Sequence, residues 1–502
     1  MKKLRLNSIS ALIYQILLII SGLILPRCYL IFYGSEVNGL LSSITQFLSF
    51  INICDMGISA VISSALYKPL AENDNKLVSK VFVYSQRFFR KISYILLAYV
   101  LVLILVYPYM VIEKFDFVFT ATLILCMSIS NFSQYFLGIS YQLLLNADQR
   151  SYIQLVINAI TLIANTIISV LIMLLGGSIH FVKLITSLIY ILRPVLMAIY
   201  VKKKYKIDYK TETDSRVVTQ KRNGIIQHIS YMICENTDIA VLTLFSTLSN
   251  VSVYSIYYLV LNSIKSLINA GTTGIQAMFG NIIAKDETEK LRALYDVFEW
   301  VMHTSITLLF TITAKMIVPF VLIYTNGTND APYEAPLFAT LMTAAFGISS
   351  IRNSMYILIR SAGHYKQTQT ASMIEALINI SISITLVHKF GLVGVAIGTL
   401  LSAVFYSTYL MFYLKKEILN RKIAKTLKQL IVDIVSVIVM VLTTIPIING
   451  NKNIIAWIAT AAFTTIVCVL DTIIIQMIFY NKMLRKTMTS FYAGLHKSQK
   501  IK

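Results

Sequence analysis

The chain has 502 residues, of which 57% are hydrophobic and 13% are charged, and its formal net charge is +21. Soluble domains carry about 25% charged residues, so this composition excludes an ordinary soluble protein. A basic excess can indicate a nucleic-acid partner. Here the basic residues lie between long apolar runs, and we therefore expect no binding of nucleic acid.

The apolar runs are long enough to cross a membrane as helices. About 20 helical residues span a hydrocarbon core of about 30 Å, and lipid offers the backbone no partner outside the helix. The first run follows Lys2, Lys3 and Arg5 and is too long for a cleaved signal peptide. In chain order we predict fourteen spans of an all-α polytopic membrane protein, at residues 8–33, 39–66, 92–112, 117–145, 153–175, 179–201, 224–247, 251–279, 297–325, 335–360, 371–388, 392–414, 430–449 and 454–480.

The distribution of basic residues predicts the orientation of these spans. With the N-terminus in the cytoplasm, 35 of the 44 Lys and Arg residues fall on the cytoplasmic side and only Lys114, Lys389 and Lys452 fall outside. Cytoplasmic loops of membrane proteins carry such an excess. We therefore expect both termini in the cytoplasm.

The sequence also contains an internal repeat. Asn52, Gly57 and Ile58 recur as Asn269, Gly274 and Ile275 at an offset of 217, and the Lys-Leu pair at 76–77 recurs at 290–291. Two parallel six-helix repeats enclose a central cavity in some transporters. The predicted parts are an N-terminal six-helix bundle (1–201), a basic cytoplasmic linker (202–223), a C-terminal six-helix bundle (224–414), a basic cytoplasmic loop (415–429), two further transmembrane helices (430–480) and a basic cytoplasmic tail (481–502).

The ionisable residues inside the predicted spans include these twelve: Arg27, Asp55, Lys183, Arg193, Glu235, Asp238, Lys265, Lys315, Arg352, Glu375, Asp433 and Asp471. A charge at the centre of a bilayer costs about 2.5–3.5 kcal/mol on insertion scales. A polar cavity removes most of this cost. Lys265 lies on a polar stripe with Asn262 and Asn269, and Asn52 lies on a similar stripe of the second span. The alternative is that these polar side chains hold helices together.

An anionic cargo is the natural ligand of such cations. We predict that Lys265, Lys315, Arg193, Arg352 and Arg27 line this cavity together with Asn262, Asn269 and Asn52, where the cations would favour an anionic cargo. The carboxylates Glu235, Asp238 and Asp55 are candidates to bind a coupling H⁺ or Na⁺, although Glu235 and Asp238 are equally well placed to pair with Lys265. Glu375, Asp433 and Asp471 are interpreted as structural. The five cysteines have no metal-binding spacing, so we expect neither metal nor cofactor.

Several motifs resemble a known family. They are Gly39-Leu-Leu-Ser-Ser, Asp55-Met-Gly-Ile, Ser361-Ala-Gly-His and Gly391-Leu-Val-Gly-Val-Ala-Ile-Gly-Thr. Together with the 6+6+2 arrangement they are similar to the Wzx-type flippases of O-antigen and capsule repeat units, in the multidrug/oligosaccharidyl-lipid/polysaccharide (MOP) exporter superfamily. This resemblance implies a bacterial inner-membrane transporter. Its cargo would be an undecaprenyl-diphosphate-linked glycan moved by alternating access. The resemblance then implies that the cations named above bind the diphosphate and the amides bind sugar hydroxyls. Its partners would include a polysaccharide polymerase and glycosyltransferases.

Other functions remain open at this stage. Within the superfamily, the alternatives are a multidrug or cation antiporter and a flippase for the peptidoglycan precursor. A membrane-embedded polysaccharide polymerase or ligase is a more remote alternative, because the longest outer loop has only about ten residues, near 326–334, and the six histidines show no metal-binding spacing. We therefore expect a transporter and not an enzyme.

Overall fold

A computed structural model describes residues 2–55, 58–211, 225–272, 274–447 and 453–499. The side chains of some residues within these helices, among them Asp55 and Glu235, lie outside the description. Most of the predicted linker at 202–223 also lies outside the described residues.

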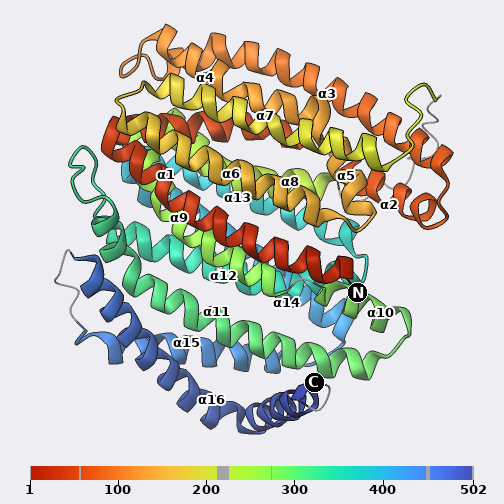
Figure 1. Ribbon diagram of the computed structural model, residues 1–502. Coiled ribbons are helices and arrows are strands. Elements are labelled where there is room, and N and C mark those ends of the chain that lie inside the picture. The colour runs from red at the N-terminus through yellow and green to blue at the C-terminus, as the bar shows by residue number, and fades with distance from the viewer. Residues whose placement is uncertain (1, 56–57, 212–224, 273, 448–452, 500–502) are drawn as a thin grey trace. The chain divides into compact units, whose positions relative to one another are not determined.

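The described chain is helical from end to end (Figure 1). Its α-helices are α1 (Lys2–Ser49), α2 (Ile58–Ala71), α3 (Asn75–Met110), α4 (Phe117–Ser133), α5 (Ile139–Ala147), α6 (Ser151–Leu174), α7 (Ile179–Lys204), α8 (Ile225–Phe245), α9 (Leu248–Gly271), α10 (Ile275–Ala284), α11 (Thr288–Tyr324), α12 (Pro336–Ser361), α13 (Tyr365–Phe390), α14 (Leu392–Leu414), α15 (Ala424–Thr444) and α16 (Ile454–Gln499). Short 3-10 or π-helical turns at Phe50–Asp55, Gln134–Gly138 and Lys415–Leu419 join some of them. The predicted all-α class is confirmed.

Within the described residues, eleven helices are long and apolar enough to cross a membrane. The difference from fourteen has three sources. The first two predicted spans form one continuous run, Arg5–Cys54; the described apolar part of the seventh is the short helix Asn236–Phe245; and α12 is not among the eleven. The polar Ser, Thr and Asn residues of α12 lower its mean hydropathy. The chain is therefore a multi-pass membrane protein.

The internal repeat appears in the order and length of the helices. Helix α2 starts at Ile58, and α10 starts at Ile275, after Gly274 with φ of 91°. Each short helix is followed by a long one, α3 with 36 residues or α11 with 37. A left-handed backbone conformation such as that of Gly274 favours glycine, because the Cβ of any other residue would strain it. The sequence repeat thus marks matching helix breaks.

A kink divides α1 at Gly34, where φ is 84° and the backbone is not helical. The helix that restarts there is capped by Asp330, whose carboxylate accepts hydrogen bonds from the Ser35 backbone N–H at 2.7 Å and from the Ser35 hydroxyl at 2.6 Å. An acidic side chain at a helix N-terminus satisfies N–H groups that have no partner within the helix. The break therefore separates the first predicted span from the second.

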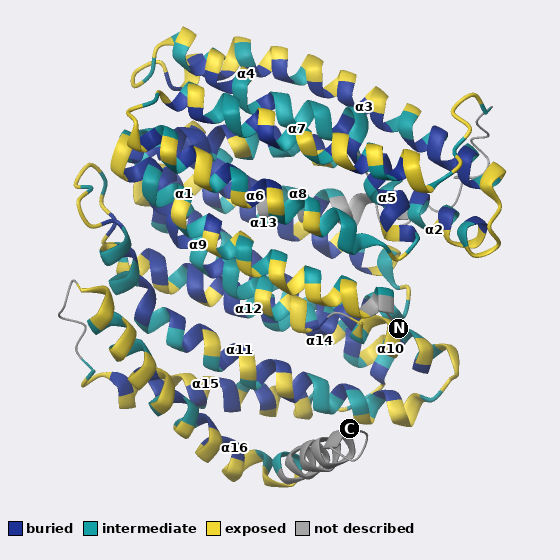
Figure 2. Cartoon of the chain, viewed as in Figure 1, coloured by how far each residue is buried: buried dark blue, intermediate teal, exposed yellow. Residues whose placement is uncertain are grey.

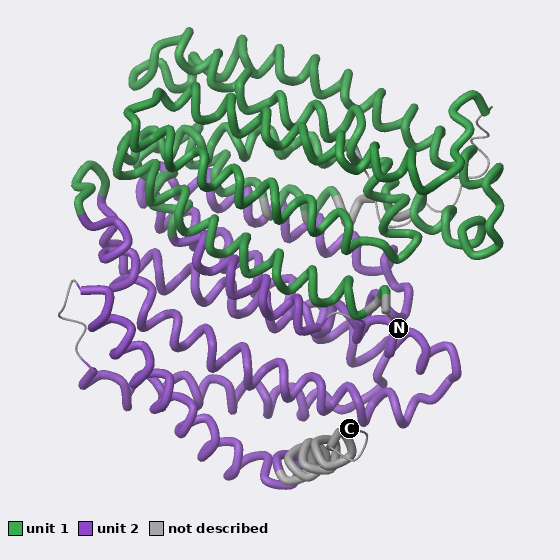
Figure 3. The backbone as a smooth tube through the Cα atoms, viewed as in Figure 1, with its two compact units in different colours: residues 1–256, 327–331 green, residues 257–326, 332–502 purple. Residues whose placement is uncertain are grey.

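The chain forms two compact units (Figure 3). Unit 1 contains residues 1–256 and 327–331, and unit 2 contains residues 257–326 and 332–502. Helix α9 begins in unit 1 and continues in unit 2. The predicted boundaries at 202–223 and 415–429 divide the chain by topology, and they stay predictions.

In unit 1, α1 packs on α6, α6 on α7, and α7 on α4. Helix α3 illustrates the packing of these spans: Phe89, Ile92 and Leu96 are buried, whereas Leu97 and Leu101 are exposed (Figure 2). Both faces are apolar, as expected for a helix with protein on one side and lipid on the other.

In unit 2, α12, α13 and α14 pack closely, and α15 and α16 both pack on α11. Gly398 permits the close approach of α13 and α14, because a Cβ there would lie 2.3 Å from the Ser383 hydroxyl and 3.0 Å from the Asn379 carbonyl oxygen. The two predicted additional helices at 430–480 correspond to α15 and the first part of α16.

Candidate functional site

Lys265 lies on the face of α9 that meets α12 in unit 2. Its amine lies 5.4 Å from the centre of the Phe346 ring, and Tyr258 packs edge-on against the same ring at 5.7 Å. One turn later, Asn269 accepts a hydrogen bond of 2.9 Å from Asn353 of α12. The predicted polar stripe of α9 thus lies along α12. Asn262, on the same stripe, is half-buried, as is Lys265.

Lys315 is half-buried on α11, four residues after Thr311. The Thr311 hydroxyl donates to the Thr307 carbonyl oxygen at 2.7 Å, so it bonds within its own helix. Among the described residues, no ion pair involves Lys315. A protonated amine at this depth favours an anionic or strongly polar ligand.

Arg352 is balanced by a carboxylate of its own unit. Its guanidinium forms an ion pair with Glu375 of α13 and lies 5.0 Å from the centre of the Tyr406 ring of α14. Only 18% of the Arg352 side chain and 9% of the Glu375 side chain are exposed. This pair joins α12, α13 and α14, so the Arg352 charge is already partly neutralised.

Arg193 is held between α6 and α7 in unit 1. Its Nε donates a hydrogen bond of 2.8 Å to the Thr161 hydroxyl, and its guanidinium stacks 3.7 Å from the centre of the Tyr190 ring. Arg27 is half-buried on α1, next to Pro26. These predicted cations therefore belong to unit 1, whereas Lys265, Lys315 and Arg352 belong to unit 2.

Lys183 shows a contact that helical spacing does not reveal. Its amine donates a hydrogen bond of 3.0 Å to the Tyr29 hydroxyl and lies 4.2 Å from the centre of that ring. The two residues are 154 positions apart, on α7 and α1. The lysine is thus held inside unit 1.

Two of the remaining predicted site residues have defined partners. Asn52 accepts a hydrogen bond of 2.6 Å from the Tyr135 hydroxyl, and the buried Asp238 accepts one of 2.8 Å from the Tyr254 hydroxyl. The side chains of Asp55 and Glu235 lie outside the described residues. Ion binding by these three acids stays a prediction.

Polar side chains of α1 also join helices, as the alternative interpretation of the stripes holds. The Ser43 hydroxyl hydrogen-bonds to Thr243 of α8 at 2.7 Å and accepts one from Tyr107 of α3 at 2.7 Å. Ser49 donates to Asn236 of α8 at 2.8 Å. Hydroxyl and amide groups commonly stabilise helix contacts in membranes in this way. At these positions polar side chains connect α1 to α3 and α8.

A polar cluster outside the spans fixes the start of α1. Asp148 accepts hydrogen bonds from Lys3 at 3.1 Å, Arg150 at 2.5 Å and the Tyr205 hydroxyl at 2.5 Å. Burial by itself would raise the pKa of Asp148, but the hydrogen bonds from Tyr205, Lys3 and Arg150 outweigh it and hold that pKa below its ordinary value of 3.8. The cluster joins three separate segments of unit 1.

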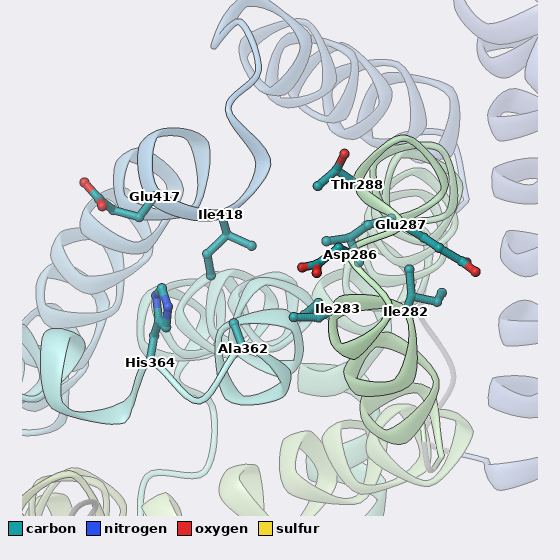
Figure 4. A pocket seen from close by; sticks show the side chains of 10 residues that line it. Ile282, Ile283, Asp286, Glu287, Thr288, Ala362, His364, Glu417 and Ile418 are labelled. Atoms are coloured by element: carbon teal, nitrogen blue, oxygen red, sulfur yellow. The ribbon is translucent and has the colours of Figure 1, made fainter.

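A pocket of about 190 Å³ lies at the ends of several helices of unit 2 (Figure 4). The Asp286 carboxylate is directed toward the space, whereas Glu287 and Glu417 point away from it (Figure 4). None of the predicted site residues lines it. The pocket is therefore separate from the predicted cation site.

Comparisons with known proteins identify the fold. No family model matches the sequence, and no curated protein matches it. Among solved structures, the lipid II flippase MurJ in an inward closed conformation has a TM-score of 0.71 and 17% identity, covering 95% of this chain and 99% of the flippase. The MATE transporter VcmN of Vibrio cholerae in its bent form has a TM-score of 0.55 and 14% identity, covering 85% of this chain and 98% of VcmN.

These similarities concern the fold, because the identities are low. The chain therefore shares its fold with the lipid II flippase MurJ and the MATE transporter VcmN.

Proposed function

We propose that this chain is a flippase for a lipid-linked oligosaccharide. Its cargo is an undecaprenyl-diphosphate-linked sugar repeat unit, which it moves by alternating access across the bacterial cytoplasmic membrane. The observation that carries the proposal is the full-length structural match to a lipid II flippase, covering 95% of this chain against 85% for VcmN. Of these two structural neighbours, the lipid II flippase therefore matches the larger part of this chain.

The chemistry of unit 2 supports an anionic headgroup as ligand. Lys265 and Lys315 are half-buried cations, and Asn262 and Asn269 supply amides on the same helix as Lys265. A diphosphate carries several negative oxygens, and charge-assisted hydrogen bonds to it are about twice as strong as neutral ones. The apolar tail requires no polar site if it stays in the bilayer.

The charge distribution supports the orientation of this transporter. With both termini in the cytoplasm, the loop 415–429 and the tail 481–502 place basic residues beside the anionic headgroups of the inner leaflet. The cargo is assembled by glycosyltransferases and consumed by a polysaccharide polymerase, and we propose both as partners.

Lys265→Ala and Lys315→Ala test the role of the cations. Loss of one charge-assisted hydrogen bond costs about 1.5–3 kcal/mol, so we expect flipping to fall about tenfold or more. The measurement is rescue of glycan export in cells that lack the flippase, with membrane abundance measured in parallel. Lys389→Ala, which removes an exposed charge at the end of α13, is the matched control.

Normal export by both variants would contradict the diphosphate contact. Export of cationic drugs by the wild-type protein, without movement of lipid-linked glycan, would instead support the multidrug alternative.

A further inference from the structure

A buried histidine and a buried aspartate meet where α15 packs on α11. His303 of α11 has no exposed side-chain surface, and 11% of the Asp433 side chain is exposed. His303 Nδ1 lies 2.5 Å from the Asp433 carboxylate. The two residues are 130 positions apart, so the contact depends on the docking of α15 against α11.

The hydrogen bonds indicate where a proton can be taken up. Gln429 Nε2 donates to the other Asp433 oxygen at 3.1 Å, so each carboxylate oxygen has one nitrogen neighbour. A contact of 2.5 Å between His303 Nδ1 and a carboxylate oxygen requires one hydrogen between the two atoms. His303 Nε2 is buried and has no hydrogen-bond partner in the described part of the chain. It is therefore the open proton-accepting atom of the pair.

The cations near Asp433 in the described part of the chain pair with other acids, so His303 is the partner of the Asp433 carboxylate. Arg421, on the segment before α15, pairs with both Asp296 and Glu299 of α11, and Lys425 of α15 also pairs with Asp296. Those two acids thus have their own cations. Among the described residues, the polar groups that contact the Asp433 carboxylate are His303 and Gln429.

Helix α16 adds two groups to these surroundings. The Tyr480 hydroxyl interacts electrostatically with Asp433, Glu299 and Arg421. Lys428 of α15 is turned toward α16, where its amine donates to the Phe479 carbonyl oxygen at 3.0 Å. Neither group supplies a positive charge to Asp433.

We propose that His303 and Asp433 form a proton-binding site, and that proton uptake at His303 strengthens the attachment of α15 and α16 to α11. With a neutral imidazole the pair carries one negative charge in a buried contact. One added proton makes the pair neutral overall, and this removes a net charge that is costly in a buried contact. Histidine is the side chain that changes charge near physiological pH. The inference is independent of the cargo.

A tryptophan beside the pair provides a direct measurement. The protein has two tryptophans, Trp300 and Trp457. Trp300 lies one turn before His303, and its indole N–H donates to Gln476 of α16 at 2.7 Å. In Trp457→Phe, the fluorescence of the purified protein therefore reports on Trp300 alone.

We expect a one-proton fluorescence transition with a midpoint between about pH 5 and 8. Adding His303→Gln, which keeps a donor to Asp433, should abolish it. Adding Asp433→Asn should change the midpoint, because the carboxylate that shares the proton is gone. A pH-independent signal, or an unchanged transition in the His303→Gln protein, would overturn the proposed site.

Hydrogen exchange tests the second part of the proposal. After correction for intrinsic rates, amides of α15 should exchange more slowly at pH 5.5 than at pH 8 in the wild-type protein, and equally at both in His303→Gln. Equal protection at both pH values in the wild-type protein would overturn the link between the proton and helix attachment. Because neither experiment involves transport, a failure here is distinct from a failure of the flippase proposal.

Discussion

Replacing Arg352 by methionine tests whether this residue binds cargo, as the sequence predicts, or holds helices together, as the structure indicates. The sequence predicts that Arg352 contacts the cargo, whereas in the structure its guanidinium forms an ion pair with Glu375. With 18% and 9% of the two side chains exposed, this is a largely buried ion pair. Removing one partner from such a pair costs about 3–5 kcal/mol, because the other charge stays buried without its counterion.

The second variant removes both charges. Arg352→Met with Glu375→Leu replaces the pair by apolar side chains of similar volume, a change that is often neutral or stabilising. We therefore expect Arg352→Met alone to lower the unfolding free energy by about 3–5 kcal/mol and the double variant to recover most of it. The assay is unfolding in bicelles by titration with a denaturing detergent, on all four members of the cycle.

Wild-type stability of the Arg352→Met protein would refute this reasoning. The flipping activity of the double variant then decides the cargo role. Activity near that of the wild type assigns Arg352 to helix packing, whereas a stable but inactive double variant returns it to the cargo site.

Two further predictions concern unit 1. Gly39→Ala places a Cβ 1.9 Å from the Leu248 carbonyl oxygen, so we expect a loss of about 1–3 kcal/mol in unfolding free energy. Gly271→Ala, where a Cβ meets nothing within 4 Å, is the control that should match or exceed wild-type stability in the same titration. The lowered pKa of Asp148 stabilises the fold above the ordinary value of 3.8, and this contribution should be lost as the pH falls below it. Thermal unfolding between pH 3 and 7 should therefore show a steeper acid decline in the wild-type protein than in Asp148→Asn, and equal slopes would contradict the prediction.

Periodicity and composition were sufficient to predict the all-α class, because lipid forces every backbone group into helical hydrogen bonds. The repeat of Asn52 and Asn269 is visible in the sequence, but the spans 39–66 and 251–279 are predicted as single helices, whereas α2 starts at Ile58 and α10 starts at Ile275. The boundary predicted between the spans 8–33 and 39–66 agrees with the kink at Gly34, where the backbone of α1 is not helical.

Contacts between residues that are distant in the sequence could not be predicted. His303 and Asp433 are 130 positions apart, and nothing in either local sequence indicates the other. Glu375 was interpreted as structural without its partner Arg352 being recognised, since helical spacing gives the face of one helix but not the neighbour that it meets. The sequence shows that few charges lie inside the spans. Which of these charges neutralise each other depends on tertiary packing.

Flipping in proteoliposomes tests the central claim most directly. Purified protein would be reconstituted with a fluorescent undecaprenyl-diphosphate-linked oligosaccharide, and the fraction that becomes accessible from the opposite leaflet would be followed over time. We predict rapid transfer with the wild-type protein. With Lys265→Ala or Lys315→Ala, the transfer rate should fall about tenfold or more. Transfer no faster than in protein-free vesicles, with protein shown to be folded and inserted, would contradict the proposal that this chain moves lipid-linked glycans.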